Sequence, residues 1–117
     1  MRCLAMILAC GVMAAPSGHA ADSALARRIA AELDAHRRDW TICTVNDVGR
    51  EVQRDRTADA TTIADGALAR CVVEEQALGA KAVQLLGAEM GRRMMDRLVA
   101  EAREALVGSA RTVQATL

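Results

Sequence analysis

Cysteine is the residue with the greatest chemical potential in this 117-residue sequence, and its four copies fall into two groups. Cys3 and Cys10 lie in an apolar N-terminal stretch, whereas Cys43 and Cys71 lie in the remainder of the chain. An even pair of cysteines in a small domain is typical of a disulfide when the domain is exported to an oxidising compartment. We therefore predict a disulfide between Cys43 and Cys71.

A reactive thiol and a metal site are the alternatives for these two cysteines. His36 lies seven residues before Cys43, about 10 Å along a helix, which is too far for a thiolate–imidazole pair. A zinc site would need four ligands from the two cysteines, His36 and an acid, without the paired short spacing of typical zinc motifs. We expect no metal ion and no cofactor.

Methionine and glutamate offer two further candidate sites. Met90 and Met94 are four residues apart, so two thioethers on one helix face could bind a soft ion such as Cu(I). Met95 lies about 100° round the helix from Met94, and core packing is the simpler interpretation in a chain without Phe or Tyr. Glu74 and Glu75 are adjacent, so on a helix they diverge and are expected to be solvated charges, not a catalytic pair.

The composition restricts the classes of function further. The chain has 15 basic and 15 acidic residues, and Trp40 is its one aromatic residue, so neither bulk attraction to nucleic acid nor base stacking is expected. The arginine doublets at 27–28, 37–38 and 92–93 each have acids nearby, which argues against anion binding. The sequence has no phosphate loop, nucleophile elbow or zinc-protease helix, and we expect no enzymatic activity.

The N-terminus has the layout of a secretory signal. Arg2 precedes an apolar run over residues 3–15, and a short stretch of small and polar residues follows it. Such a run would form a helix of roughly 20 Å, short of the roughly 30 Å bilayer core. Gly18 and Ala20 fit the positions before a cleavage site, so we predict removal of residues 1–20, a mature domain 21–117 beginning at Ala21, and no permanent membrane span. A lipid anchor at Cys10 is the weaker alternative, because it leaves an apolar stretch unexplained.

The mature part is predicted to be all-α, a three- to four-helix up-down bundle, because it contains no proline and is rich in alanine. The apolar periodicity predicts helices from Asp22 to near His36, from about Asp39 to Arg54, from Asp59 to the Gly87 region, and from about Ala88 to Gln114. His36 would then lie near a helix end, where a cation is favoured. The β-branched run at 41–45 leaves a short strand as a minor alternative.

The predicted disulfide agrees with an antiparallel pairing of the second and third predicted helices. Cys43 lies fourteen residues before Thr57, and Cys71 lies fourteen residues after it. A turn near Thr57 would therefore bring the two sulfurs into register and leave Trp40 packed beside them.

The spacing Trp40-x-x-Cys43, the alanine-rich segment 62–71 and the charged C-terminal helix together resemble small uncharacterised exported proteins of high-GC proteobacteria. The use of 14 arginines against one lysine, Lys81, fits such a genome. The resemblance implies a helical exported domain and no particular activity. We therefore expect a non-enzymatic periplasmic or secreted protein that acts by protein–protein contact or self-association. The alternative is a carrier of a small apolar ligand in a cavity lined by Ala and Met.

Overall fold

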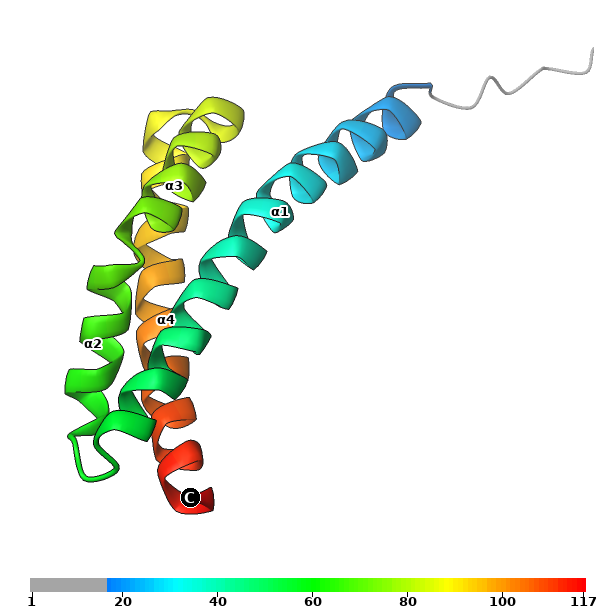
Figure 1. The fold of residues 1–117 in the computed structure, drawn as a ribbon. Helices are drawn as coiled ribbons and strands as arrows, with labels where there is room; N and C mark the ends of the chain where they lie inside the picture. The colour runs from blue at the N-terminus through cyan, green and yellow to red at the C-terminus, as the bar shows by residue number, and fades with distance from the viewer. Residues whose placement is uncertain (1–16) are drawn as a thin grey trace, which may run out of the picture.

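Four helices form the part of the chain that the structure describes. The computed structural model describes residues 17–117, where the helices are α1 (Ser17–Arg54), α2 (Ala60–Arg70), α3 (Val72–Leu86) and α4 (Ala88–Thr116), without a strand. α1 descends, α2 and α3 return in line with each other, and α4 descends again beside them (Figure 1). The predicted all-α, up-down bundle is confirmed for these residues.

The predicted break between the first two helices is wrong. Residues 37–39 lie inside α1, because Arg37, Arg38 and Asp39 interrupt neither the backbone hydrogen bonds nor the helical conformation. His36 therefore lies in the middle of a helix, and its expected position near a helix end is also wrong. Residues 41–45 are helical, which excludes the strand alternative for that run.

The third predicted helix is divided at Cys71. This residue has φ −101° and ψ 24°, and it forms both the C-cap of α2 and the N-cap of α3. No Gly or Pro accompanies the break, so local chemistry does not predict it. Cys71 is the point at which this part of the chain is covalently attached to α1.

The two remaining turns have local chemical causes. Asp59 caps α2, because its carboxylate accepts a hydrogen bond from the Thr62 backbone N–H at 2.9 Å. In the same turn, the Thr57 hydroxyl donates to Asp55 at 2.8 Å. Gly87 joins α3 to α4 with φ +90° and ψ 162°, a conformation that strongly favours glycine.

The core consists of two clusters stacked along the bundle. One is built from α1, α2 and α4 and consists mainly of Val and Ala, with Ile63 and Leu106; the other contains Trp40, Cys71 and Leu78. Small side chains let the helices approach closely: a Cβ added at Gly91 of α4 would lie 2.8 Å from the Val83 backbone of α3.

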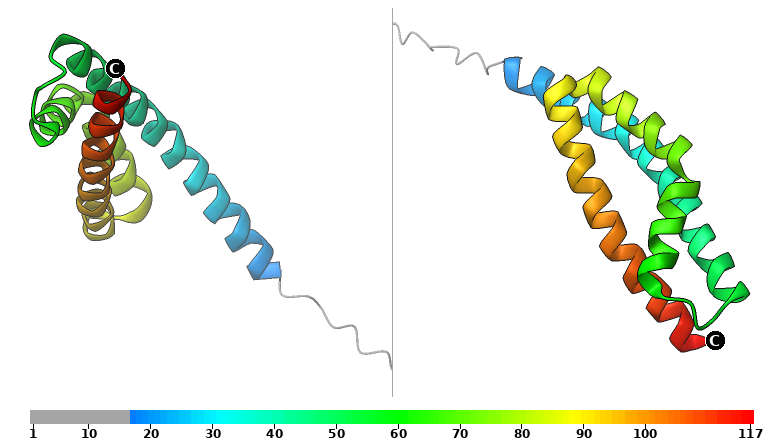
Figure 2. Two further views of the ribbon diagram at one scale, coloured as in Figure 1. Left: turned by 90° about the horizontal axis from the view of Figure 1, so that it is seen from below. Right: turned by 90° about the vertical axis from the view of Figure 1, so that its left-hand side faces the viewer.

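The N-terminal part of α1 extends beyond this core. Residues 21–28 are all exposed, and Leu25 is 55% exposed. Further along, Ile29 and Leu33 are partly buried. Figures 1 and 2 show this end of the helix diverging from the other three helices. One continuous helix therefore has a packed half and a half that is largely open to solvent.

Candidate functional site

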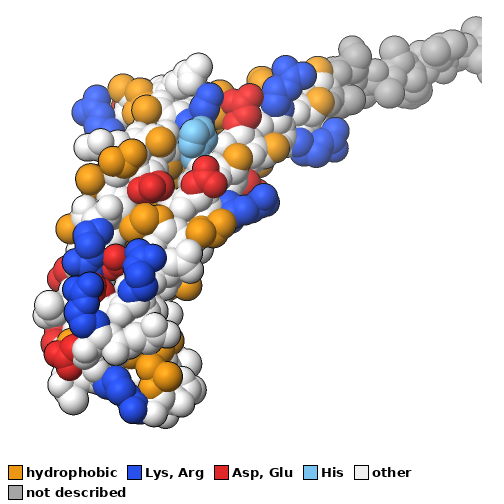
Figure 3. Space-filling view, in the orientation of Figure 1, with side chains coloured by type: hydrophobic (Ala, Val, Ile, Leu, Met, Phe, Trp, Pro, Cys, Tyr) orange, Lys and Arg blue, Asp and Glu red, His pale blue; other side chains and the backbone are white. Residues whose placement is uncertain are grey.

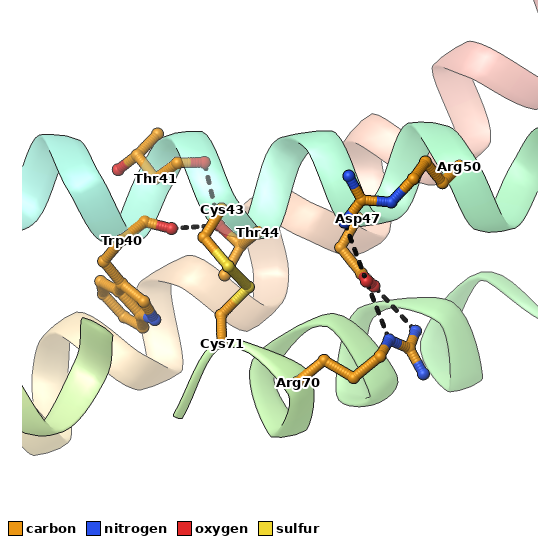
Figure 4. Close-up of a disulfide and its surroundings, with 8 residues drawn as sticks. All are labelled: Trp40, Thr41, Cys43, Thr44, Asp47, Arg50, Arg70 and Cys71. Atoms are coloured by element: carbon orange, nitrogen blue, oxygen red, sulfur yellow. Dashed lines mark hydrogen bonds and ion pairs between the residues drawn. A yellow bond between two sulfur atoms is a disulfide. The ribbon is translucent and has the colours of Figure 1, made fainter. Parts of the chain in front are cut away.

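The disulfide lies at the junction of three helices. Cys43 comes from the C-terminal half of α1 and Cys71 from between α2 and α3, and their Cα atoms are 6.0 Å apart (Figure 4). Cys71 is 1% exposed, whereas Cys43 is partly exposed. The predicted Cys43–Cys71 pairing is confirmed. It joins α1 to the α2–α3 junction because the first two predicted helices are one helix.

Trp40 packs beside this bond, as predicted. Trp40 is 3% exposed and belongs to the same cluster as Cys71 and Leu78. The indole Nε1–H is buried and has no hydrogen-bond acceptor among the described residues. The ring therefore serves as core, not as an exposed platform for a ligand.

An ion-pair network beside the disulfide was not predicted from the sequence. Arg70 donates from Nε and Nη2 to the two carboxylate oxygens of Asp47, at 2.8 and 2.7 Å (Figure 4). The Asp47 side chain is only 5% exposed, and it also pairs with Arg50 at 3.6 Å. The Arg70 hydrogen bonds outweigh the effect of burial and hold the pKa of Asp47 below its ordinary value of 3.8. Asp47 lies one turn after Cys43, and Arg70 directly precedes Cys71. The predicted pairing of the two cysteines was therefore the feature of the sequence from which the Asp47–Arg70 contact could have been inferred.

The three candidate methionines differ in burial. Met90 is 61% exposed, so its expected core position is wrong. Met94 is partly buried and lines one surface hollow together with Met90, whereas Met95 packs against the Trp40 cluster as core.

The two glutamates that follow Cys71 differ in their neighbours. Glu74 lies in the first turn of α3, and one of its carboxylate oxygens and the sulfurs of Cys43 and Cys71 are all within 4.8 Å of one another. Glu75 is not part of this group. The sequence alone did not indicate the approach of Glu74, because it depends on Cys71 ending one helix and beginning the next.

Two hollows lie in succession between α1 and α4. The first, of about 400 Å³, has Leu33, Leu78, Met94 and Leu98 among its walls. The second, of about 140 Å³, is lined by residues of both helices: Trp40, Thr41, Thr44, Val45, Ala102, Ala105, Leu106 and Ser109. We call the two hollows together the α1–α4 groove.

Charges of both signs border the wider part of this groove. Asp34 and Arg37 lie on the α1 side, and Arg97 and Glu101 lie on the α4 side. Asp34 and Arg37 are 3.3 Å apart. On the face drawn in Figure 3, basic side chains also lie next to acidic ones. A surface that fits this groove must carry both charges around an apolar centre.

Comparisons with protein-family models, with curated proteins and with solved structures found no match. Among residues 17–117, none of the helices combines the length and the apolar character needed to cross a bilayer. The predicted apolar signal run at 3–15 and the alternative anchor at Cys10 lie outside the described residues. The predicted cleavage between Ala20 and Ala21 stays a prediction.

Proposed function

We propose that this chain is an exported, non-enzymatic helical protein that functions by self-association through the α1–α4 groove. The observation that carries the proposal is the groove itself, an apolar trough between two helices with one acid and one base on each side. A helical surface that covered it would complete the packing of the bundle.

Charge complementarity favours a second copy of this chain as the occupant. In a two-fold dimer each surface meets itself in the opposite direction. Arg97 and Glu101 lie one turn apart on α4, so antiparallel pairing of α4 helices about a point near Val99 would set each arginine against the partner's glutamate. On α1, Asp34 and Arg37 can form the same kind of reciprocal ion pairs with a second copy.

The open half of α1 supports the same proposal. Residues 21–28 are exposed on all sides, and isolated helical segments of this length are marginal in water. Leu25, Ile29 and Leu33 follow each other at intervals of four residues, which gives an apolar stripe that lacks full cover. A second copy would bury this stripe and stabilise the segment.

Export is supported by two independent features. The N-terminal sequence has the layout of a secretory signal, and the disulfide is of the kind that persists in oxidising compartments. A periplasmic or secreted location agrees with both features.

A carrier of a small apolar ligand is the second candidate, favoured by the narrower hollow beside Trp40. This hollow of about 140 Å³ opens to the surface, and alanines but no methionines are among the residues that line it. A ligand in this hollow would shift the fluorescence emission of Trp40. Benzene is a suitable first probe, and self-association without a ligand site predicts no change in the Trp40 emission when benzene is added.

The test of self-association is the mass of the oxidised protein in solution, measured by sedimentation across a range of concentrations. We expect a reversible dimer. Ala30→Glu places a charge in the groove and should shift the equilibrium to monomer, whereas Ala31→Glu makes the same change at a neighbouring exposed residue that does not line the groove. A monomer at every concentration, or equal effects of the two variants, would contradict the proposal.

A further inference from the structure

Glu74 gives the Cys43–Cys71 pair a third potential metal ligand. The two sulfurs and a Glu74 carboxylate oxygen all lie within 4.8 Å of one another. We propose that reduction of the disulfide converts this junction into a binding site for one thiophilic divalent cation, such as Zn²⁺ or Cd²⁺. Cys43, Cys71 and Glu74 supply three ligands, and water supplies the fourth.

The donor set fits such an ion. Zinc binds thiolate sulfur at about 2.3 Å and carboxylate oxygen at about 2.0–2.2 Å in a tetrahedral arrangement, which places ligand atoms roughly 3–4 Å apart. The Glu74 oxygen lies within 4.8 Å of both sulfurs, whereas the sulfurs are bonded to each other and must separate to that spacing after reduction. Because the two cysteine Cα atoms are 6.0 Å apart, both sulfurs can reach one ion by side-chain rotation.

The position of the site in the fold leaves the metal ligands accessible and without a competing cation. Cys71 is the N-cap of α3 and also the C-cap of α2, so the positive end of one helix dipole and the negative end of the other meet at this residue and their effects on a thiolate oppose each other. Arg70, the adjacent cation, is directed away from the sulfurs toward Asp47 (Figure 4), so it does not compete for Glu74. Cys71 is buried, whereas Cys43 and Glu74 are partly exposed, which leaves one side open for the water ligand.

The disulfide and the metal ion exclude each other chemically. A dithiol reductant breaks the S–S bond: it transfers two electrons and two protons, leaves two protein thiols, and becomes a cyclic disulfide itself. Binding of the cation then displaces one proton from each thiol. In the oxidised state Cys43 and Cys71 have no thiolate to offer, so their redox state determines whether the site exists. This proposal is independent of the α1–α4 groove and of self-association.

The test is a titration of the protein with Cd²⁺ after reduction by a phosphine, which adds no competing thiol, without oxygen. We expect a thiolate-to-cadmium charge-transfer absorption that saturates at one ion per chain, with release of two protons. The oxidised protein should show neither signal.

Neighbouring glutamates provide the matched variants. Glu74→Gln should weaken Cd²⁺ binding about 10-fold or more, whereas Glu75→Gln should bind as the parent does. Absence of the absorption, or equal affinities of the two variants, would overturn the proposal. If reduction by itself unfolds the chain, circular dichroism detects this. In that case Cd²⁺ must restore the helical signal of the parent. Failure to restore it also overturns the proposal.

Discussion

Asp47 and Arg70 form a bidentate ion pair that lies beside the disulfide. Asp47 follows Cys43 by one turn of α1, and Arg70 is the residue before Cys71, so a covalent link and an ionic link join the same two regions side by side. The carboxylate is 5% exposed and the Arg70 side chain 50% exposed, so solvent weakens the pair on one side only.

We expect Arg70→Gln to lower the free energy of unfolding by about 1–3 kcal/mol, because it leaves a buried carboxylate without its main donor. This value lies below the range for fully buried pairs, since the Arg70 side chain is half exposed. Arg103→Gln is the control, because Arg103 pairs with Asp65 at 2.7 Å where both side chains are about half exposed. The loss of stability from Arg103→Gln should be clearly smaller than that from Arg70→Gln, because solvent screens an exposed pair. Urea denaturation measures both, and equal losses would contradict this ranking.

The same pair predicts a pH dependence. The folded state lowers the pKa of Asp47 below 3.8, so the stabilisation is complete above the unfolded pKa of about 3.9 and is lost as the pH falls through the lower folded pKa. The stability difference between the parent and Asp47→Asn should therefore be constant near neutral pH and shrink in strongly acidic solution. A difference that grows as the pH falls would contradict the assignment.

The disulfide is expected to contribute a large part of the stability. Closing a loop with a sequence separation of 28 restricts the unfolded chain by about 3.6 kcal/mol in the loop-entropy model. Cys43→Ser with Cys71→Ser should lower the melting temperature by about 15 °C or more. Calorimetry of the double variant and of the reduced parent checks this value. A double variant that melts like the parent would show that the bond has no stabilising role.

Replacement by alanine at two glycines of α4 should change the stability of the fold in opposite directions. A Cβ at Gly91 would lie 2.8 Å from the Val83 backbone, so Gly91→Ala must separate α3 from α4 and should destabilise the fold by about 1–3 kcal/mol. A Cβ at Gly108 meets nothing within 4 Å, so Gly108→Ala should stabilise the helix by about 0.5–1 kcal/mol. Thermal denaturation of the two variants gives the signs, and a shared sign would contradict the packing described.

Export can be tested by the intact mass of protein recovered from the secreting cell. We expect a chain that begins at Ala21, because Gly18 and Ala20 occupy the positions that signal peptidase reads. A product that retains residues 1–20, or that begins at a lipidated Cys10, would contradict the predicted cleavage.

The helical class, the Cys43–Cys71 pairing and the burial of Trp40 could be predicted from the sequence, because each depends on composition or on regular spacing. Alanine-rich segments without proline favour helix, and two cysteines placed symmetrically about a turn come into register. Helix propensity is a local property of the sequence. The cysteine register depends on one turn, which the polar residues at 55–59 indicate.

The junctions between helices could not be predicted in the same way. Charged residues at 37–39 resemble a boundary, yet they continue α1, whereas Cys71 breaks a helix without Gly or Pro. The approach of Asp47 to Arg70 and of Glu74 to the sulfurs follows from that break. Tertiary packing therefore determines these helix boundaries and side-chain contacts, which local helix propensity does not predict.

The continuity of α1 from the core into solvent has a consequence for amide hydrogen exchange. Hydrogen bonds near Val48, in the buried cluster, should open only with most of the fold, whereas those over residues 21–28 have no tertiary contacts to protect them. A single unbroken helix should therefore show a steep gradient of exchange rates along its length. The fast-exchanging end should slow as protein concentration rises only if a second molecule covers it.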